Sequence, residues 1–244
     1  MKENKYDQDS FFQKYSQMSR SQQGLEGAGE WHELEKLLPD FTNQRVLDLG
    51  CGYGWHCWYA MEHLAKSVIG VDISQKMLDV AKQKHHHPHI AYQNSAMEDL
   101  DYQENSFDIV MSSLAFHYIN DFQGLVKNIS HWLSPGGYFV FSVEHPIFTA
   151  QGSQDWYYDE NGQILHFPVD NYYYEGKREA HFLGESVIKY HRTLTTYLNT
   201  LLENDFIIEN VVEPMPPAHM MDLPGMKDEM RRPMMLLIKA QKKL

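Results

Sequence analysis

The chain has 244 residues, enough for one large domain with a substantial hydrophobic core. Hydrophobic residues make up 43% and charged residues 22% of the sequence, which is ordinary for a globular protein. The formal net charge of −12 disfavours a nucleic-acid partner, because an acidic surface repels a phosphate backbone. We therefore expect no nucleic-acid partner.

The sequence shows no signal for a membrane or for export. No apolar run has the length of a membrane-spanning helix, and the polar N-terminus does not resemble a signal peptide. The only two cysteines, Cys51 and Cys57, lie at or beside a glycine-rich loop, and we interpret them as free thiols. We expect a cytoplasmic protein, monomeric or homodimeric, without a membrane partner.

The first part of the chain predicts helices and then a repeating strand-and-helix pattern. Apolar residues recur at helical spacing over residues 1–40 until Pro39, which predicts a helical cap. From Arg45 onward, apolar runs alternate with amphipathic stretches, as in parallel sheets. We expect strands near 45–49, 67–71, 89–93, 107–112 and 137–143, and helices over 55–65, 74–84 and 121–133.

The pattern breaks after the fifth strand. Residues 145–190 are rich in aromatic side chains, have no helical period and are too long for a plain connection. We expect an inserted hairpin or lid. Its aromatic stretch 153–174 either covers a substrate or serves ordinary packing or a dimer contact. The alternation resumes with a helix near 191–204 and strands near 206–212 and 233–240.

These elements together predict an α/β fold, a doubly wound, Rossmann-like domain with a mostly parallel seven-stranded sheet. We expect a single domain over residues 1–244, with the aromatic-rich insertion placed after strand five. Its parts are a helical cap (1–40), a cofactor-binding core (41–144), a substrate-side insertion (145–190) and a C-terminal helix with strands (191–244).

A glycine-rich loop follows the first predicted strand. Residues 46–54 read VLDLGCGYG, with Gly50, Gly52 and Gly54 at every second position. Glycine lets a ligand approach the backbone closely. Asp72 ends the second predicted strand, where a carboxylate can accept hydrogen bonds from both hydroxyls of a ribose. The pair predicts a nucleoside cofactor, and the GxGxG spacing disfavours a nicotinamide dinucleotide, whose loops are usually spaced GxGxxG.

With Asp48 before the loop and Asp72 after it, this motif resembles that of class I S-adenosylmethionine-dependent methyltransferases, in particular small bacterial ones. The segments 72–78, 96–100, 106–118 and 133–137 resemble further parts of that family, so the resemblance covers most of the chain. It implies S-adenosyl-L-methionine as the cofactor. The contacts that it implies are Asp48, Gly50, Cys51, Gly52, Asp72, Ile73, Met77, Ala96, Met97, Glu98, Ser113 and Leu114.

Two parts of this resemblance concern single positions, Arg20 and the pair Ser95 and Ala96. In the resembled subfamily, the stretch that corresponds to residues 15–25 folds over the cofactor, where Arg20 would suit the cofactor's carboxylate; a solvated arginine on a surface helix is the alternative. Many relatives carry Asp where Ser95 or Ala96 stands here. Glu98 or backbone groups would then replace that side chain at the adenine.

Candidate catalytic residues follow strands four and five, whose carboxyl ends meet the glycine loop at one edge of the sheet. His117 and His145 are the two candidates for a general base, because imidazole titrates near neutral pH. Glu144 would orient His145 or contact the methyl acceptor. The alternative is that these residues form only a polar wall.

The leading functional hypothesis is methyl transfer to a small-molecule acceptor. A protein or tRNA methyltransferase remains an alternative, as does a non-catalytic, cofactor-binding regulatory or partner protein. The run His85–His89 invites a metal interpretation, but adjacent residues seldom point their rings at one ion. We expect a solvated loop there and no metal site.

Overall fold

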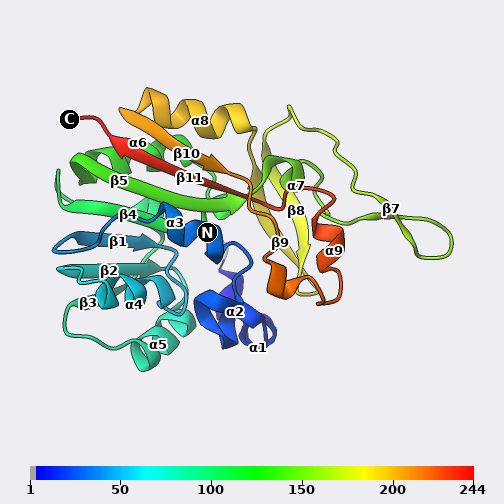
Figure 1. Cartoon of the computed structure of the whole chain (residues 1–244), viewed down its shortest axis with the longest axis horizontal. Coiled ribbons are helices and arrows are strands. Elements are labelled where there is room, and N and C mark those ends of the chain that lie inside the picture. Colours follow the sequence, from blue (N-terminus) through cyan, green and yellow to red (C-terminus); the bar gives the residue numbers. More distant parts are fainter. Residues whose placement is uncertain (1–3) are drawn as a thin grey trace.

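A seven-stranded sheet forms the centre of the computed structural model, which describes residues 4–244 (Figure 1). The strand order is β10-β11-β5-β4-β1-β2-β3. Strands β1 to β5 run parallel, and β11 is antiparallel to both β5 and β10. The predicted doubly wound sheet is confirmed. Its strands are β1 Arg45–Leu49, β2 Ser67–Asp72, β3 Ile90–Asn94, β4 Phe107–Ser113, β5 Leu133–Glu144, β10 Phe206–Val212 and β11 Met235–Lys242.

Helices cover both faces of the sheet. Residues of α3, α4 and α5 pack on one face, and residues of α6 and α8 pack on the other. A Rossmann-like sheet needs this cover, because parallel strands bury both of their faces. The helices and short helical turns around the sheet are α3 Trp31–Leu37, α4 Trp55–Glu62, α5 Gln75–Lys84, η3 Met97–Asp99, η4 Phe116–Tyr118, α6 Phe122–Trp132 and α8 Leu194–Glu203.

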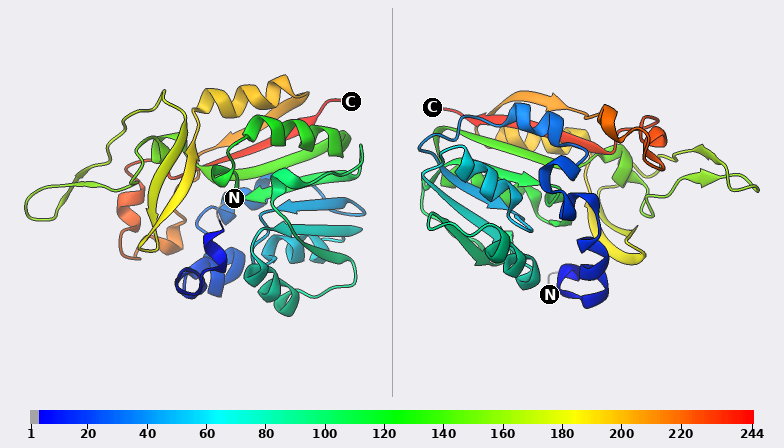
Figure 2. Two further views of the ribbon diagram at one scale, coloured as in Figure 1. Left: turned by 180° about the vertical axis from the view of Figure 1, so that it is seen from behind. Right: turned by 60° about the horizontal axis from the view of Figure 1, so that its bottom comes forward.

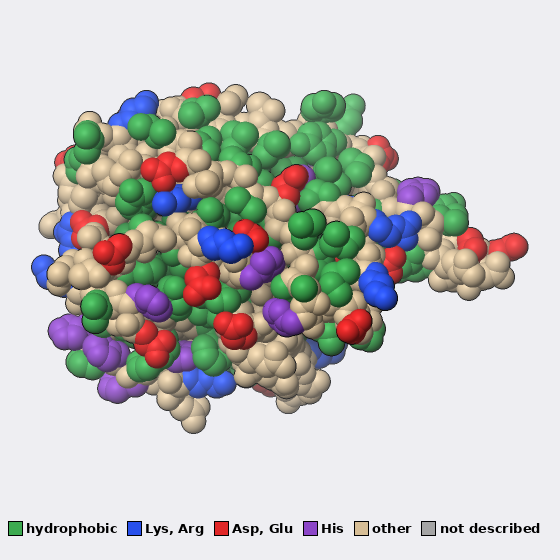
Figure 3. Space-filling view, viewed as in Figure 1, with side chains coloured by type: hydrophobic (Ala, Val, Ile, Leu, Met, Phe, Trp, Pro, Cys, Tyr) green, Lys and Arg blue, Asp and Glu red, His purple; other side chains and the backbone are tan. Residues whose placement is uncertain are grey.

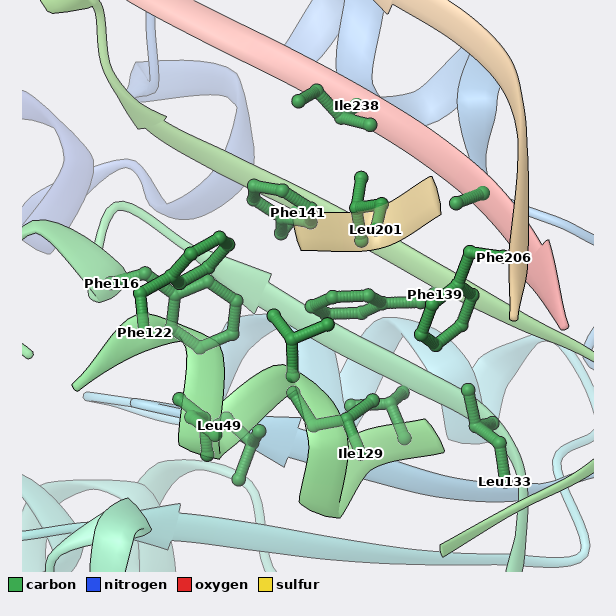
Figure 4. Close-up of a cluster of buried hydrophobic side chains, with 14 of the residues drawn as sticks. Leu49, Phe116, Phe122, Ile129, Leu133, Phe139, Phe141, Leu201, Phe206 and Ile238 are labelled. Carbon is green, nitrogen blue, oxygen red and sulfur yellow. The ribbon is translucent and has the colours of Figure 1, made fainter. Parts of the chain in front are cut away.

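Strand β5 shows how the core is divided between the two faces. Phe139 and Phe141 point to the α6 and α8 side, where they lie with Phe116, Phe122 and other buried side chains (Figure 4). Val140 points the opposite way, into the cluster that includes residues of α3. Successive strand residues alternate between faces, so one strand serves two cores. The resulting packed sheet gives the strand ends a rigid base.

The segment after β5 forms two antiparallel ribbons. The first, β6–β7, lies within residues 155–168, here called the arm, and projects from the molecule (Figures 1 and 2). The second, β8–β9, here called the hairpin, lies nearer the sheet. The predicted insertion is therefore more elaborate than one hairpin. Its elements are α7 Pro146–Ala150, β6 Tyr157–Tyr158, β7 Ile164–His166, β8 Gly176–Phe182 and β9 Glu185–His191, and the C-terminal loop adds η5 Ala218–Met220 and α9 Met226–Glu229.

The N-terminal cap consists of short helices that span from the sheet core to the hairpin. Asp7 accepts a hydrogen bond from the Ser74 hydroxyl at 2.6 Å, just before α5. Lys14 donates to the Leu183 carbonyl at the hairpin turn, at 2.9 Å. Across the described residues, no helix is both long and apolar enough to cross a bilayer. The cap elements are η1 Lys5–Asp7, α1 Asp9–Ser16, α2 Ser19–Gln22 and η2 Gly24–Gly27.

Candidate functional site

A cavity of about 1210 Å³ lies at the carboxyl ends of the core strands. Pockets for a single small ligand usually measure about 300–1,000 Å³, so this one has room for a cofactor and a second molecule. Its inner wall consists of the glycine loop and the ends of β2, β4 and β5, and the N-terminal cap closes one side. The outer wall comes from the arm, the hairpin and the C-terminal loop, and includes Trp156, Tyr158, Ile164, Val187, Tyr190 and Met220.

The glycine loop is held tightly against the end of β2. The amides of Gly50 and Cys51 both donate to the Val71 carbonyl, at 2.8 and 2.9 Å. Gly50 has φ +77°, and a Cβ there would lie 2.5 Å from the Ala115 Cβ. A side chain at this position would therefore clash, so the glycine is required for the close approach of two loops. Gly50, Cys51 and Gly52 all line the cavity.

Asp72 lies at the cavity wall with its carboxylate fixed by two backbone donors. Its Oδ2 accepts from the Gly52 amide at 2.9 Å, and its Oδ1 accepts from the Ser74 amide at 2.8 Å. Burial raises the pKa of Asp72 to about 6, against the effect of these hydrogen bonds. The carboxylate is oriented before any ligand arrives, and each oxygen keeps further lone pairs for hydroxyl donors.

Asp48, a predicted cofactor contact, does not line this cavity. It is 1% exposed and accepts a hydrogen bond from the Cys57 thiol of α4 at 3.2 Å. Burial raises its pKa to about 7. Because strand residues alternate between faces, a residue two positions before Gly50 points under the loop, toward α4. The structure therefore favours a supporting position for Asp48 rather than direct contact.

The other residues predicted at the cofactor lie on three successive loops of the inner wall. Leu114 holds a left-handed backbone conformation, φ +51°, which is uncommon for a residue with a side chain. Its amide donates to the Ser142 hydroxyl at 3.1 Å, which fixes the loop after β4 to β5. The predicted residues on these loops that line the cavity are Ile73, Met77, Ala96, Met97, Glu98, Ser113 and Leu114.

Arg20 lines the cavity and forms an ion pair that the sequence did not reveal. Its Nη2 lies 2.6 Å from the Glu30 Oε1, and the Ser113 hydroxyl donates to the same oxygen at 3.1 Å. Burial opposes the charge on Glu30, but Arg20 holds the pKa of Glu30 below its usual value. Glu30 is the residue just before α3, and the sequence around it does not single it out. The interpretation of Arg20 as a solvated surface residue does not fit this geometry.

His117 and Glu144 lie together on the inner wall, but neither is arranged as a free base. The His117 Nδ1 accepts from the Glu144 amide at 3.4 Å, so in the neutral ring the Nε2 carries the proton. Burial lowers the pKa of His117 to about 4. The carboxylate of Glu144 accepts from Lys189 at 2.5 Å and from Gln154 at 2.7 Å. The His117 Nδ1 and the Glu144 carboxylate are thereby committed to contacts within the protein.

Lys189 was not among the site residues predicted from the sequence. It lies on β9, where alternate residues Val187, Lys189 and His191 are buried. Alternation in residues 185–191 groups Lys189 with Glu185 and His191 and apart from Ile188 and Tyr190, so the pattern did not indicate that this lysine is buried. Its partner Glu144, 45 positions earlier in the chain, was not readable from the pattern.

His145, the other predicted base, lies outside the cavity lining. Its Nδ1 accepts from the Ile147 amide at 3.1 Å and so caps α7, and its Nε2 lies 2.8 Å from the Glu213 carboxylate. Burial lowers the pKa of His145. The prediction that Glu144 orients His145 is not supported, because the Glu144 carboxylate contacts Lys189 and Gln154 instead. His145 has the position of a structural cap.

The histidine run 85–89 differs from the expected solvated loop at its first residue. His85 is 4% exposed, its Nδ1 lies 2.8 Å from the Tyr53 carbonyl, and its ring packs against Trp55. His85 thus supports the glycine loop from below. Within residues 4–244, no three His, Cys, Asp or Glu side chains are grouped as metal ligands would be.

The arm is fixed to the molecule by Arg231 and Arg232, which the sequence left without a role. The Arg231 guanidinium donates to the carbonyls of Ile164 and Leu165 in the arm. The Arg232 guanidinium lies 4.5–4.9 Å from the ring centres of Phe148, Trp156 and Phe167. Cation–π contacts of this kind add to packing where the charge is shielded from water. Aromatic residues of the arm therefore serve both packing and the cavity wall.

The fold and the site define a class of protein, a doubly wound domain with a large cavity at the carboxyl ends of its strands. Residues 47–141 match the family model described as a methyltransferase domain. A structure assigned to the S-adenosylmethionine-dependent methyltransferases, from Listeria monocytogenes, is 56% identical and covers 91% of this chain and 100% of its own, with a TM-score of 0.87. The chain belongs to the S-adenosylmethionine-dependent methyltransferases.

Two further relatives are also similar over nearly the whole chain. The structure of an S-adenosylmethionine-dependent methyltransferase from Mesorhizobium loti is 42% identical over 90% of this chain and 100% of its own, with a TM-score of 0.83. An uncharacterized protein of Haemophilus influenzae is 35% identical over 97% of this chain and 96% of its own. The similarity thus extends over the cap, the insertion and the C-terminal part, well beyond the family model.

Proposed function

We propose that this enzyme methylates a small molecule that binds between the cofactor and the outer wall. The observation that carries the proposal is that one continuous cavity joins Asp72 and the glycine loop to the arm and the hairpin. When bound, S-adenosylmethionine supplies a sulfonium methyl group, which the acceptor's lone pair takes as the carbon–sulfur bond breaks and its electrons return to sulfur. The chain's own contribution is to bind the cofactor and the acceptor, to orient them toward each other and to exclude water.

The residues of the inner wall fit this cofactor. Asp72 offers an oriented carboxylate to the ribose hydroxyls, and the backbone of Gly50 to Gly52 leaves room for close approach. Arg20 offers a guanidinium to the cofactor's carboxylate, and Glu30 holds that guanidinium in place. We assign the adenine to the loop of Ala96 to Glu98, which lines the same side. Asp48 supports the loop from beneath.

Positioning is sufficient for much of the rate in this type of reaction. Holding two reactants in line contributes about 7–11 kcal/mol to lowering a barrier. No side chain is required as a base when the acceptor reacts through a lone pair and releases its proton to water afterwards. We assign His117 to the acceptor side as a hydrogen-bond donor through its Nε2, because its tautomer and lowered pKa disfavour proton abstraction.

Surface charge favours a small acceptor over tRNA. On the face shown in Figure 3, Lys and Arg side chains are scattered among acidic ones and form no broad basic area. We also assign the enzyme to the cytoplasm, since its two free cysteines, Cys51 and Cys57, suit a reducing compartment.

The test is transfer of a labelled methyl group. The protein is incubated with methyl-labelled S-adenosylmethionine and a whole cell extract, and label is then counted in the small-molecule, protein and RNA fractions. We expect label in the small-molecule fraction, and its loss with the Asp72→Ala variant. Label confined to protein or RNA would contradict the small-molecule acceptor, and absence of label from every fraction would favour a non-catalytic role.

A further inference from the structure

The outer wall of the cavity is largely apolar. The arm contributes Trp156, Tyr158 and Ile164, and the hairpin contributes Val187 and Tyr190. Aromatic and branched side chains of this kind stabilise a ligand by burying apolar surface and by ring contacts. The wall is therefore suited to rings or hydrocarbon rather than to a strongly hydrated group.

The buried basic side chains next to this wall already have hydrogen-bond partners within the protein. Lys189 pairs with Glu144 at 2.5 Å, and Arg232 pairs with Glu229 at 2.7 Å. Arg192 donates to the backbone carbonyls of Phe116 and Asn120. Each of these three basic side chains is less than 10% exposed. A charged ligand would have to compete with these existing partners or remain unpaired, which is costly away from water.

Two lysines stand where the cavity meets solvent. Lys5 and Lys177 both line the cavity, and Lys177 is an exposed residue of β8. Water screens an exposed charge, so Lys177 would add little to the binding of an anion. Lys5 belongs to η1 of the cap rather than to the outer wall, so neither lysine turns that wall into an anion site.

From this combination we infer that the methyl acceptor is a neutral, largely apolar molecule, carrying its nucleophilic atom at the end that faces the cofactor. The inference rests on the proposed function, since it concerns the acceptor of the same site. It excludes acceptors whose buried part bears a phosphate, a sulfonate or an ammonium group.

Three probes with one ring system test the charge preference directly. The protein, saturated with S-adenosylhomocysteine, is titrated with 2-naphthol, naphthalene-2-sulfonate and 2-naphthylmethylamine by calorimetry at pH 7. We expect 2-naphthol to bind at least roughly tenfold more tightly than either charged ring, in keeping with the cost of an unpaired charge. Equal or tighter binding of a charged ring, or no binding of 2-naphthol, would overturn the inference.

Matched variants locate the binding at the outer wall. Tyr158 lines the cavity and is 48% exposed, while its neighbour Tyr157 is 56% exposed, lies outside the lining and stacks on His166. We expect Tyr158→Ala to weaken 2-naphthol binding roughly 3- to 10-fold and Tyr157→Ala to leave it unchanged. Equal effects of the two variants would show that the ring binds elsewhere and would contradict the inference.

A gain of function completes the design. Ile164→Lys places an unpaired cation in the outer wall and should raise the affinity for naphthalene-2-sulfonate roughly tenfold, with S-adenosylhomocysteine affinity unchanged. No gain in sulfonate affinity would contradict the location. Titration with S-adenosylhomocysteine alone tests the proposed function separately. If S-adenosylhomocysteine does not bind, the proposed function is wrong. If it binds but a charged ring is preferred, only the inference of a neutral acceptor is wrong.

Discussion

Asp72 combines two properties that make the cofactor site sensitive to pH. Its pKa is raised to about 6 by burial, and only its ionised form offers both oxygens as acceptors to ribose hydroxyls. The carboxyl group is thus protonated in the empty site below about pH 6. Cofactor binding favours ionisation, so the affinity should increase as the pH rises through this range.

We predict that S-adenosylmethionine binds roughly tenfold more weakly at pH 5 than at pH 7, because the ionised fraction of Asp72 falls by about that factor. Calorimetric titrations at both pH values measure the effect. The Asp72→Asn variant should lose the pH dependence while keeping Asp48, whose own pKa of about 7 is the nearest competing cause. A pH dependence that persists in this variant would assign the effect to Asp48 instead.

Arg20 allows a test that distinguishes one end of the cofactor from the other. We predict that Arg20→Met weakens S-adenosylmethionine binding by about 1.5–3 kcal/mol, the usual value of a hydrogen bond to a charged group. Binding of 5′-methylthioadenosine, which has the nucleoside and no carboxylate, should change by less than about 0.5 kcal/mol. Equal losses for the two ligands would mean that Arg20 acts on the fold or the nucleoside rather than on the carboxylate.

At the scale of elements, one buried ion pair joins the hairpin to the sheet. Lys189 of β9 reaches Glu144 at the end of β5, and Gln154 bonds to both. Gln154 holds a left-handed backbone conformation, φ +61°, next to these contacts. The outer wall is therefore positioned from the same strand that ends at the inner wall of the cavity.

We predict that Lys189→Met destabilises the protein by about 3–5 kcal/mol, because it leaves the Glu144 charge buried without its partner. The double variant Lys189→Met with Glu144→Gln removes both charges and should recover most of this loss. Urea unfolding of the wild type, both single variants and the double variant measures the coupling. Additive losses in this cycle would show that the pair does not hold the hairpin.

The sequence predicted the elements of the core far better than it predicted the outer wall. Strands such as 45–49 and 107–112 were readable because both faces of a parallel sheet are covered, which gives continuous apolar runs. The cap was predicted as helical, but its division into short helices was not. Gly24, with φ +67°, lies at one of these breaks, in η2 between α2 and α3.

The same limit holds for the candidate site. Asp72 and the glycine loop follow local rules of strand and turn, so their positions at the cavity were readable. Pairings such as Glu30 with Arg20 depend on how separate elements pack against each other, and the periodicity of the sequence does not indicate which elements will be in contact. For His145 the local pattern was misleading. Its place next to a strand end suggested a base, whereas its side chain caps helix α7.

At the scale of the whole molecule, the cap spans from α5 to the hairpin, and β5 carries both walls. We propose on this basis that the chain is one domain and unfolds as one unit, despite its inserted arm. Saturating S-adenosylhomocysteine binds only the folded form and should raise the unfolding midpoint. At 100 times the dissociation constant the gain is about 2.7 kcal/mol, or roughly 5–10 °C for a chain of this size.

Differential scanning calorimetry with and without S-adenosylhomocysteine tests this prediction. One transition that moves as a whole is the expected result. Two transitions, of which only one responds to the ligand, would show that the insertion or the cap folds separately from the cofactor-binding core.

We propose that one cavity holds the cofactor on its inner wall and presents the methyl group to the outer wall. A crystal structure of the protein with S-adenosylhomocysteine tests it most directly. We predict that the ribose hydroxyls bond to Asp72, that the carboxylate contacts Arg20, and that the sulfur faces the wall formed by Trp156 and Tyr158. A ribose bonded elsewhere, or a sulfur turned away from that wall, would contradict the account.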